Sequence, residues 1–211
     1  MTAQIPTDVA AVIAALTLAY PDADCTLDYV SPFQLLVATR LAAQCTDKRV
    51  NMVTPELFAH FPDAQSMSGA DTAEIEAIIH PCGLAPTKAS NISEMSKTLL
   101  RDFGGVVPGT IEELLKLPGV GRKTANLILG EVFGDKNAVV VDTHCTRLSY
   151  RLRLTDNHLP EKIEKDLRAI LPEGTARGLC HRFVEHGRQV CTARSPRCTG
   201  CTLTELCPKR L

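Results

Sequence analysis

The chain has 211 residues, of which 45% are hydrophobic and 22% charged, so it holds enough apolar material for one or two packed domains. The 23 basic and 24 acidic residues give a net charge of −1, which excludes a chain that binds nucleic acid through its total charge alone. No apolar run reaches membrane-spanning length and no signal peptide opens the sequence, so we expect a cytoplasmic protein without a membrane partner.

Apolar residues at helical spacing predict helices nearly throughout the chain. The first is centred on residues 10–20. Ser31 and Pro32 form the start of a second, from Phe33 to about Cys45, which is apolar almost all round and therefore buried. Thr46 and Asp47 begin a third. Further helices are predicted at residues 72–79, 88–103, 122–133, 143–153, 161–170 and 175–190, with a short one after Thr110. The valine run 139–141 is too short to imply a sheet, so the fold class is all-α.

Four cysteines lie close together near the C-terminus, at Cys191, Cys198, Cys201 and Cys207. So short a segment cannot bury enough apolar surface to order itself, which predicts a loop folded around a metal ion or cluster. Nine cysteines without a secretory signal also favour metal binding over disulfides. The single C-x2-C pair with wider outer spacings favours an iron–sulfur cluster, while zinc and unliganded cysteines remain alternatives.

A glycine hairpin, Leu117-Pro118-Gly119-Val120-Gly121, connects two predicted helices. Its glycines permit a tight turn that exposes backbone amides at the start of the next helix, where phosphate binds well. A plain helix connection is the alternative. Lys123 follows in the first helical turn, where the helix dipole and Arg122 are expected to lower its pKa and favour the nucleophilic neutral amine. The alternative is an ordinary surface lysine.

Asp142 opens a further helix after the valine run. The simplest interpretation is an N-cap, and a capping carboxylate can in addition stabilise positive charge that develops on a sugar. The basic stretch from residue 181 to 211 holds six Lys and Arg against two acids, which suits either a phosphate-binding face or a solvated surface.

The ordered combination of LPGVGRKTAN (117–126), VDTH (141–144) and the four-cysteine loop resembles endonuclease III of the helix-hairpin-helix DNA glycosylase superfamily. The likeness extends to Ser31-Pro32-Phe33, to residues 41–47 and to Gly83-Leu84, and so covers nearly the whole chain. The resemblance implies an all-α fold of two lobes. One is a helical barrel that contains the hairpin, at residues 25–135, and the other is an iron–sulfur lobe made of residues 1–24 and 136–211.

The same resemblance implies roles for individual residues. Lys123 matches the nucleophile that forms a Schiff base with C1′ of the sugar, and Asp142 matches the catalytic carboxylate. Gln44 and Leu84 match residues that fill the gap left by an extruded base. Gly119, Val120 and Gly121 match the hairpin that holds the DNA backbone. The ligands of a [4Fe–4S] cluster match Cys191, Cys198, Cys201 and Cys207.

The implied activity is removal of oxidised pyrimidines from damaged double-stranded DNA, followed by β-elimination at the abasic site, by a monomer that is nucleoid-associated if bacterial. Arg40 interrupts the apolar second helix, so we expect it either to reach the DNA or to pair with an internal acid. Arg194 and Arg197 are expected to contact phosphates. Two rival interpretations are a non-catalytic DNA-binding protein and a mismatch adenine glycosylase. Lys123 and Asp142 together disfavour the non-catalytic protein, which needs neither. Lys123 and the lack of a further C-terminal domain disfavour the adenine glycosylase.

Overall fold

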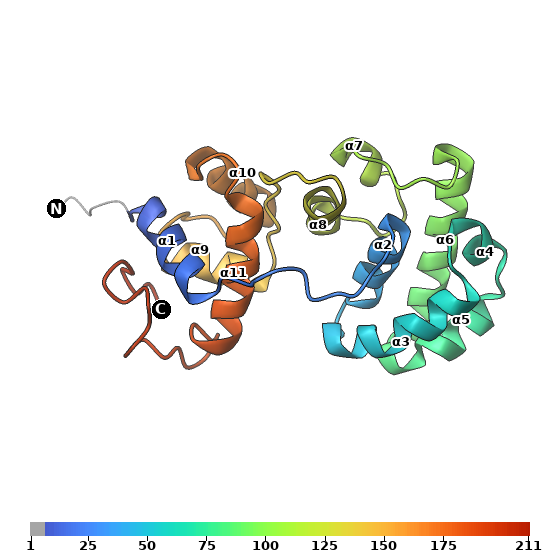
Figure 1. Cartoon of the computed structure of the whole chain (residues 1–211), viewed down its shortest axis with the longest axis horizontal. Coiled ribbons are helices and arrows are strands. Elements are labelled where there is room, and N and C mark those ends of the chain that lie inside the picture. The colour runs from blue at the N-terminus through green and yellow to red at the C-terminus, as the bar shows by residue number, and fades with distance from the viewer. Residues whose placement is uncertain (1–6) are drawn as a thin grey trace. The chain divides into compact units, whose positions relative to one another are not determined.

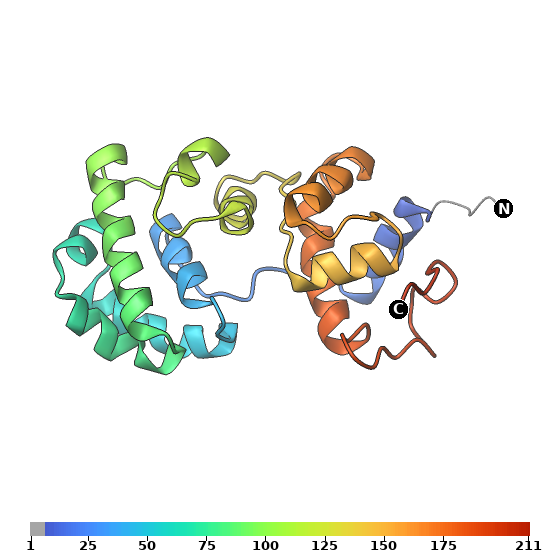
Figure 2. The same cartoon turned by 180° about the vertical axis from the view of Figure 1, so that it is seen from behind.

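A computed structural model describes residues 7–211 of the chain, and residues 1–6 of the expected iron–sulfur lobe lie outside it. Figures 1 and 2 show the chain from opposite sides. The described residues form helices joined by turns, with no β-strand among them, which confirms the all-α prediction. They divide into two compact units: a contiguous unit, Thr26–Phe133, and a two-segment unit, made of the chain up to Cys25 and of Gly134–Leu211.

The contiguous unit contains seven α-helices and one 3-10 turn: α2 (Pro32–Leu41), α3 (Asp47–His60), α4 (Ala64–Gly69), α5 (Thr72–Ile79), η1 (His80–Cys82), α6 (Ala85–Phe103), α7 (Ile111–Leu114) and α8 (Arg122–Val132). The long helix α6 packs against α4 and α5, and α2 packs against α3, α6 and α8. Apolar residues at helical spacing fill the space between them, so that Leu36, Leu57, Ile75, Ile92 and Leu99 are fully buried.

Local capping chemistry explains where several of these helices begin. The hydroxyl of Ser31 accepts a hydrogen bond from the amide of Gln34 at 3.2 Å, as predicted for the start of α2. Thr46 caps α3 in the same way through the amide of Arg49. α2 ends at Leu41, earlier than the predicted end near Cys45, because the chain turns there and Gln44 adopts a left-handed backbone with φ 55°.

One further boundary and one whole helix differ from the sequence-based prediction. α6 begins at Ala85 rather than at Lys88, because Pro86 fits the first turn of a helix, where no hydrogen bond is required of its nitrogen. The short helix α4 was not predicted, since its sequence AQSMSG is mostly small and polar and shows no clear apolar period. Asp63 starts it with a capping box to Ser66.

The two-segment unit contains α1 (Val9–Ala19), α9 (Thr143–Arg151), α10 (Pro160–Ile170) and α11 (Ala176–Gln189). α1 packs against α11, although the two are far apart in sequence (Figure 1). Their shared core includes Phe183, which is fully buried, together with Val12, Leu16 and Leu148. After Gln189 the chain forms turns rather than helix. Across residues 7–211 no helix is both long and apolar enough to cross a membrane.

Candidate functional site

The hairpin Leu117–Gly121 is a tight turn between α7 and α8. The amide of Val120 donates to the carbonyl of Leu117 at 3.1 Å, and the side chain of Val120 is buried, which fixes the turn to the core. Gly121 is the N-cap of α8, and no side chain caps this helix end. The first amides of α8 therefore have no side-chain acceptor and form the kind of helix start that binds anions.

Arg40 supports this hairpin from α2. Its guanidinium donates from Nη1 to the carbonyl oxygen of Gly119, and burial lowers the pKa of the guanidinium from its ordinary value. Gly119 has φ 75°, and a Cβ placed there would lie 2.7 Å from Cζ of Arg40. No acid pairs with Arg40 among residues 7–211, so the expectation of an internal ion pair is wrong, while contact with DNA stays a prediction.

Lys123 is the second residue of α8, directly after the uncapped helix start. Its side chain is exposed to solvent, as a group that must reach an external substrate has to be. The exposed amine and the amides of the hairpin come from the same seven-residue stretch. This part of the chain can therefore hold a backbone phosphate and present an amine beside it.

Asp142 is the N-cap of α9, in agreement with the simplest interpretation of its sequence. Its Oδ1 accepts a hydrogen bond of 2.7 Å from the amide of Cys145. The residue is half-buried, and Oδ2 makes no hydrogen bond to any described residue. One oxygen therefore fixes the carboxylate in place, while the other remains able to interact with a developing positive charge.

Gln44 and Leu84 share an unusual backbone conformation. Both are exposed, and both lie in the left-handed region, with φ 55° at Gln44 and φ 51° at Leu84. Leu84 is 56% exposed at the N-cap of α6, an unfavourable place for a large apolar side chain. Left-handed conformations of residues other than glycine persist only where the surroundings hold them, and they concentrate at functional sites.

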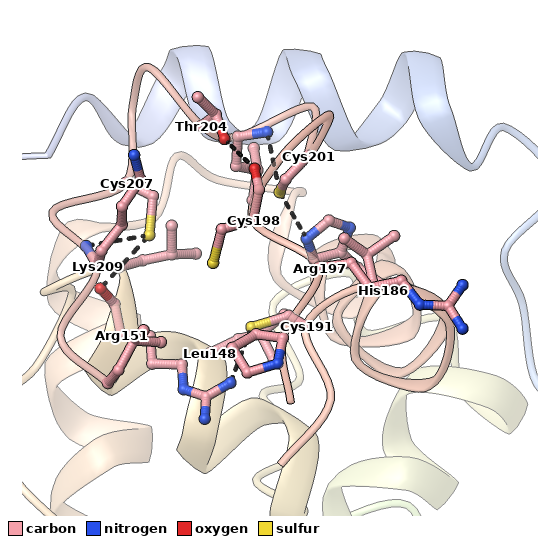
Figure 3. Close-up of a pocket in the computed structure, with 15 residues that line it drawn as sticks. Leu148, Arg151, His186, Cys191, Arg197, Cys198, Cys201, Thr204, Cys207 and Lys209 are labelled. Carbon is pink, nitrogen blue, oxygen red and sulfur yellow. Dashed lines mark hydrogen bonds between the residues drawn. The ribbon is translucent and has the colours of Figure 1, made fainter. Parts of the chain in front are cut away.

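The four clustered cysteines line one pocket in the two-segment unit. Figure 3 shows the sulfurs of Cys191, Cys198, Cys201 and Cys207 around a common hollow that the turns after α11 enclose. In the described part of the chain, no three of these sulfurs lie within 4.8 Å of one another. A single tetrahedral zinc ion with 2.3 Å bonds would require sulfurs about 3.8 Å apart. The pocket is therefore more open than one zinc ion needs.

Several groups of the protein point hydrogen-bond donors at these sulfurs. Arg151 donates to Sγ of Cys191 at 3.3 Å, and backbone amides reach Sγ of Cys201 and of Cys207, each at 3.4 Å. Burial, and secondarily the neighbouring cysteines, raise the pKa of the Cys201 and Cys207 thiols. Bringing four thiolates together here is unfavourable without a compensating cation, so this donor set fits a metal centre.

A buried histidine lies behind the same pocket. His186 on α11 is 1% exposed, with Nε2 3.4 Å from Sγ of Cys201 and Nδ1 3.0 Å from the hydroxyl of Tyr20. Burial lowers the pKa of His186. A neutral ring can hydrogen-bond the sulfur on one side and the phenol on the other, as outer-shell partners of metal ligands commonly do.

Arg194 and Arg197 lie in the turns between the first two cysteines, and both are exposed. No described carboxylate forms an ion pair with either guanidinium, which leaves their charge available to an external anion. Because these turns carry Cys191 and Cys198 as well, the placement of the two arginines depends on whatever the cysteines bind.

The sequence-based prediction missed three residues at these sites. They are Lys88, buried in α6, Arg151 and His186. Lys88 occupies an apolar helical face with Ala85, Ala89 and Ile92, a pattern that would flag an unusual buried cation. The partners of Lys88 and Arg151 include backbone carbonyls distant in sequence, which no motif describes.

Known proteins resemble this chain along nearly its whole length. Residues 37–173 match the family model of the HhH-GPD superfamily base excision DNA repair proteins. Endonuclease III of Synechocystis sp. is 50% identical over 90% of this chain and 86% of its own length. A solved non-covalent endonuclease III–DNA complex is 38% identical, with a TM-score of 0.90 over 97% of this chain and 96% of that chain. A trapped endonuclease III–DNA covalent intermediate, an estranged-adenine complex, is 39% identical, with a TM-score of 0.87 over 93% of this chain and 92% of that chain.

Proposed function

Because the chain belongs to the endonuclease III family of the HhH-GPD superfamily and is therefore a DNA glycosylase and lyase of base excision repair, we propose that it removes oxidised pyrimidines from duplex DNA and cleaves the resulting abasic site. The observation that carries the proposal is the exposed amine of Lys123, one residue after the helix start at the hairpin. A relative 39% identical to this chain has been trapped covalently on DNA, which requires a nucleophile on the protein.

In the proposed reaction, the lone pair of Lys123 Nζ attacks C1′ of the damaged nucleotide, and the bond from C1′ to the base breaks as the base leaves with its electron pair. The nitrogen loses a proton, and the C1′–O4′ bond then breaks as O4′ takes up a proton, which opens the sugar and leaves a protonated imine between Lys123 and C1′. A proton is then removed from C2′, and the C3′–oxygen bond breaks by β-elimination. Water finally hydrolyses the imine and restores the lysine. The covalent intermediate thus divides one difficult displacement into easier steps.

Asp142 supports the departure of the base. As C1′ becomes positively charged, the carboxylate stabilises that charge through the oxygen not used to cap α9. The cap holds the carboxylate in one orientation, so no rearrangement is needed when the charge appears. Electrostatic preorganisation of this kind contributes more than a mobile carboxylate in water.

The duplex must also be opened, because a base inside it cannot be reached. We propose that the amides of Gly119, Val120 and Gly121 hold a backbone phosphate and that Gln44 and Leu84 enter the space left by the extruded base. The exposed, apolar side chain of Leu84 supports this role, since its insertion between bases would remove that side chain from water. Arg194 and Arg197 are proposed to bind further phosphates.

We propose that Cys191, Cys198, Cys201 and Cys207 hold a [4Fe–4S] cluster. A cluster distributes its thiolates over four iron ions, which suits sulfurs spaced more widely than one zinc ion would require. When bound, such a cluster orders the loop and offers one-electron redox chemistry. The chain's own contribution is a set of donors to the sulfurs, from Arg151 and two backbone amides, and a hydrogen bond between His186 and Sγ of Cys201.

One assay tests the proposal directly. Duplexes carrying thymine glycol, a preformed abasic site or an adenine opposite 8-oxoguanine are incubated with the protein, and strand cleavage is followed with and without borohydride. We expect cleavage of the first two and a borohydride-trapped complex on both. Breakage of the adenine mispair alone, and only after alkali is added to break the abasic site that base removal leaves, would identify a mismatch adenine glycosylase. Binding without breakage of any duplex, even after alkali, would identify a non-catalytic DNA-binding protein.

A further inference from the structure

One buried ammonium group connects two exposed segments of the contiguous unit. Lys88 on α6 is 3% exposed. Its Nζ donates to the carbonyl of Leu41 at 2.8 Å and to the carbonyl of Cys82 at 2.9 Å. Leu41 is the last residue of α2 and Cys82 is the last residue of η1. The lysine is thus held between the end of α2 and the end of η1, which are separated by about forty residues of sequence.

The two acceptors explain why a lysine occurs in this apolar environment. Lysine is almost never fully buried unless its charge is compensated. The carbonyls at the end of a helix have no partner within the helix and carry partial negative charge, so an ammonium group placed among them is stabilised. The cation satisfies two such carbonyls, and hydrogen bonds with an ionised donor are stronger than neutral ones. The two hydrogen bonds therefore account for the burial of Lys88, which joins the end of α2 to the end of η1.

The end of α2 and the end of η1 each come shortly before one of the left-handed residues. Gln44 follows Leu41 by three residues, and Leu84 follows Cys82 by two. A second bond reaches η1 from α3, the helix that follows Gln44: Nη1 of Arg49 donates to the carbonyl of Pro81 at 3.4 Å. Backbone conformations that are unfavourable in isolation are retained only where neighbouring groups hold them, and here the most deeply buried of those groups is the ammonium of Lys88.

We propose that Lys88 is a positioning residue that fixes the Gln44 and Leu84 segments relative to each other, so that both side chains enter the opened duplex as one preformed wedge. This inference rests on the proposed function, in which those two side chains fill the gap. Lys88 itself is too buried to touch DNA. Its effect is confined to DNA from which a base has been extruded, because only there does the relative placement of the two segments matter.

The test compares two lysines of the same helix. Lys88→Met keeps the length of the side chain but removes both hydrogen bonds. Lys97→Met is the control, since Lys97 is half-exposed on α6 and pairs only with Glu94. We measure affinity for undamaged duplex and for the same duplex carrying an abasic-site analogue. Lys88→Met should lower the preference for the analogue by about tenfold, while the affinity for undamaged DNA and the iron content stay unchanged. Lys97→Met should change neither affinity.

A double-mutant cycle separates positioning from general destabilisation. In a background of Gln44→Ala with Leu84→Ala, adding Lys88→Met should lower the preference little further, because the side chains through which it acts are gone. An equal loss in both backgrounds would overturn the proposal. Fluorescence of 2-aminopurine opposite a thymine glycol gives an independent readout, and Lys88→Met should slow its rise at unchanged affinity for undamaged DNA.

If Lys88→Met does not fold, Lys88→Gln replaces it, because its amide can still donate to one carbonyl while the charge is absent; a preference equal to that of the wild type would overturn the proposal. Failure of the proposed function would show itself differently. The wild-type protein would then fail to prefer the abasic analogue over undamaged duplex at all. A wild-type preference that Lys88 variants retain in full would contradict the role of Lys88 alone.

Discussion

The guanidinium group of Arg40 occupies the space that a side chain on Gly119 would need, with Cζ only 2.7 Å from where a Cβ would stand. The same arginine donates a hydrogen bond to the carbonyl of Gly119. The hairpin is therefore supported from α2 by a side chain that any residue larger than glycine at position 119 would displace. Gly121, two residues later, has no atom within 4 Å of its Cβ position and an ordinary φ of −102°.

The two glycines should consequently respond differently to alanine. Gly119→Ala should lower the free energy of unfolding by roughly 1–2 kcal/mol or more, because it combines a left-handed backbone with displacement of Arg40. Gly121→Ala should leave stability nearly unchanged yet weaken DNA binding, because the methyl group keeps a phosphate away from the backbone. Thermal unfolding and DNA titration of both variants check this. Equal losses of stability would contradict the structural distinction.

Lys123→Gln should abolish borohydride trapping on thymine glycol DNA, because trapping requires an imine and an amide side chain cannot form one. Binding to an abasic-site analogue should remain nearly intact. Lys116→Gln, at an exposed lysine just before the hairpin, is the matched control and should trap normally. Trapping by Lys123→Gln with the wild-type yield would mean that another residue is the nucleophile.

Asp142→Asn should slow base removal by roughly 100-fold if the carboxylate supplies about 3 kcal/mol of transition-state stabilisation. Cleavage of a preformed abasic site should suffer less, because no base has to leave. Asparagine caps helices as well as aspartate does, so α9 should persist and the loss of stability should stay within about 1 kcal/mol. Single-turnover rates on both substrates, with thermal unfolding, make the comparison. A parallel loss of rate and stability would assign Asp142 to structure alone.

The protein purified without oxygen should contain about four iron and four sulfide per chain. Cys198→Ser should lower the iron content and weaken DNA binding together, because Arg194 and Arg197 are carried by the same turns. Cys180→Ser is the control, since Cys180 is a buried core residue of α11 outside the pocket, and its iron content should be normal. Elemental analysis and the visible absorption spectrum report the outcome, and stoichiometric zinc without iron would contradict the cluster.

Substituting both Arg194 and Arg197 by alanine should weaken binding to all duplex sequences alike. It should also flatten the dependence of log affinity on log salt by about two units, one for each phosphate that the variant no longer neutralises. Arg101→Ala serves as a control, because Arg101 is exposed on α6 and engaged with Asp102. A slope unchanged by the double substitution would place the phosphate-binding residues elsewhere on the protein.

The parts of the fold that depend on neighbouring residues could be predicted from the sequence. The caps at Ser31, Thr46 and Asp142 each involve an amide three residues further on, so the motif contains the whole interaction. The all-α class followed from apolar spacing, and the family followed from ordered motifs. The predicted end of α2, near Cys45, lies too late in the chain, because no residue next to Gln44 indicates a left-handed backbone there.

The interactions that escaped prediction are those with backbone atoms distant in sequence. Arg40 was expected to meet DNA or an acid, yet it meets the carbonyl of Gly119, 79 residues away. Lys88 lies on an otherwise apolar face of its helix, which indicates burial, but its acceptor at Leu41 lies 47 residues away and could not be predicted. A carbonyl is present in every residue and leaves no mark in the sequence, so only the folded backbone reveals which one is used.

The division of the chain also bears on the order of events during synthesis. Thr26–Phe133 is one continuous stretch, so all of its core is available once the ribosome has passed it. α1 leaves the ribosome earlier but packs against α11, whose residues are made more than 150 positions later. Throughout that interval Val12 and Leu16 lack their core partner Phe183. Because the cysteine loop follows α11 in the chain, the proposed metal loading comes later than the synthesis of α11. Until α11 has been made, nascent chains should expose α1 to chaperones and proteases.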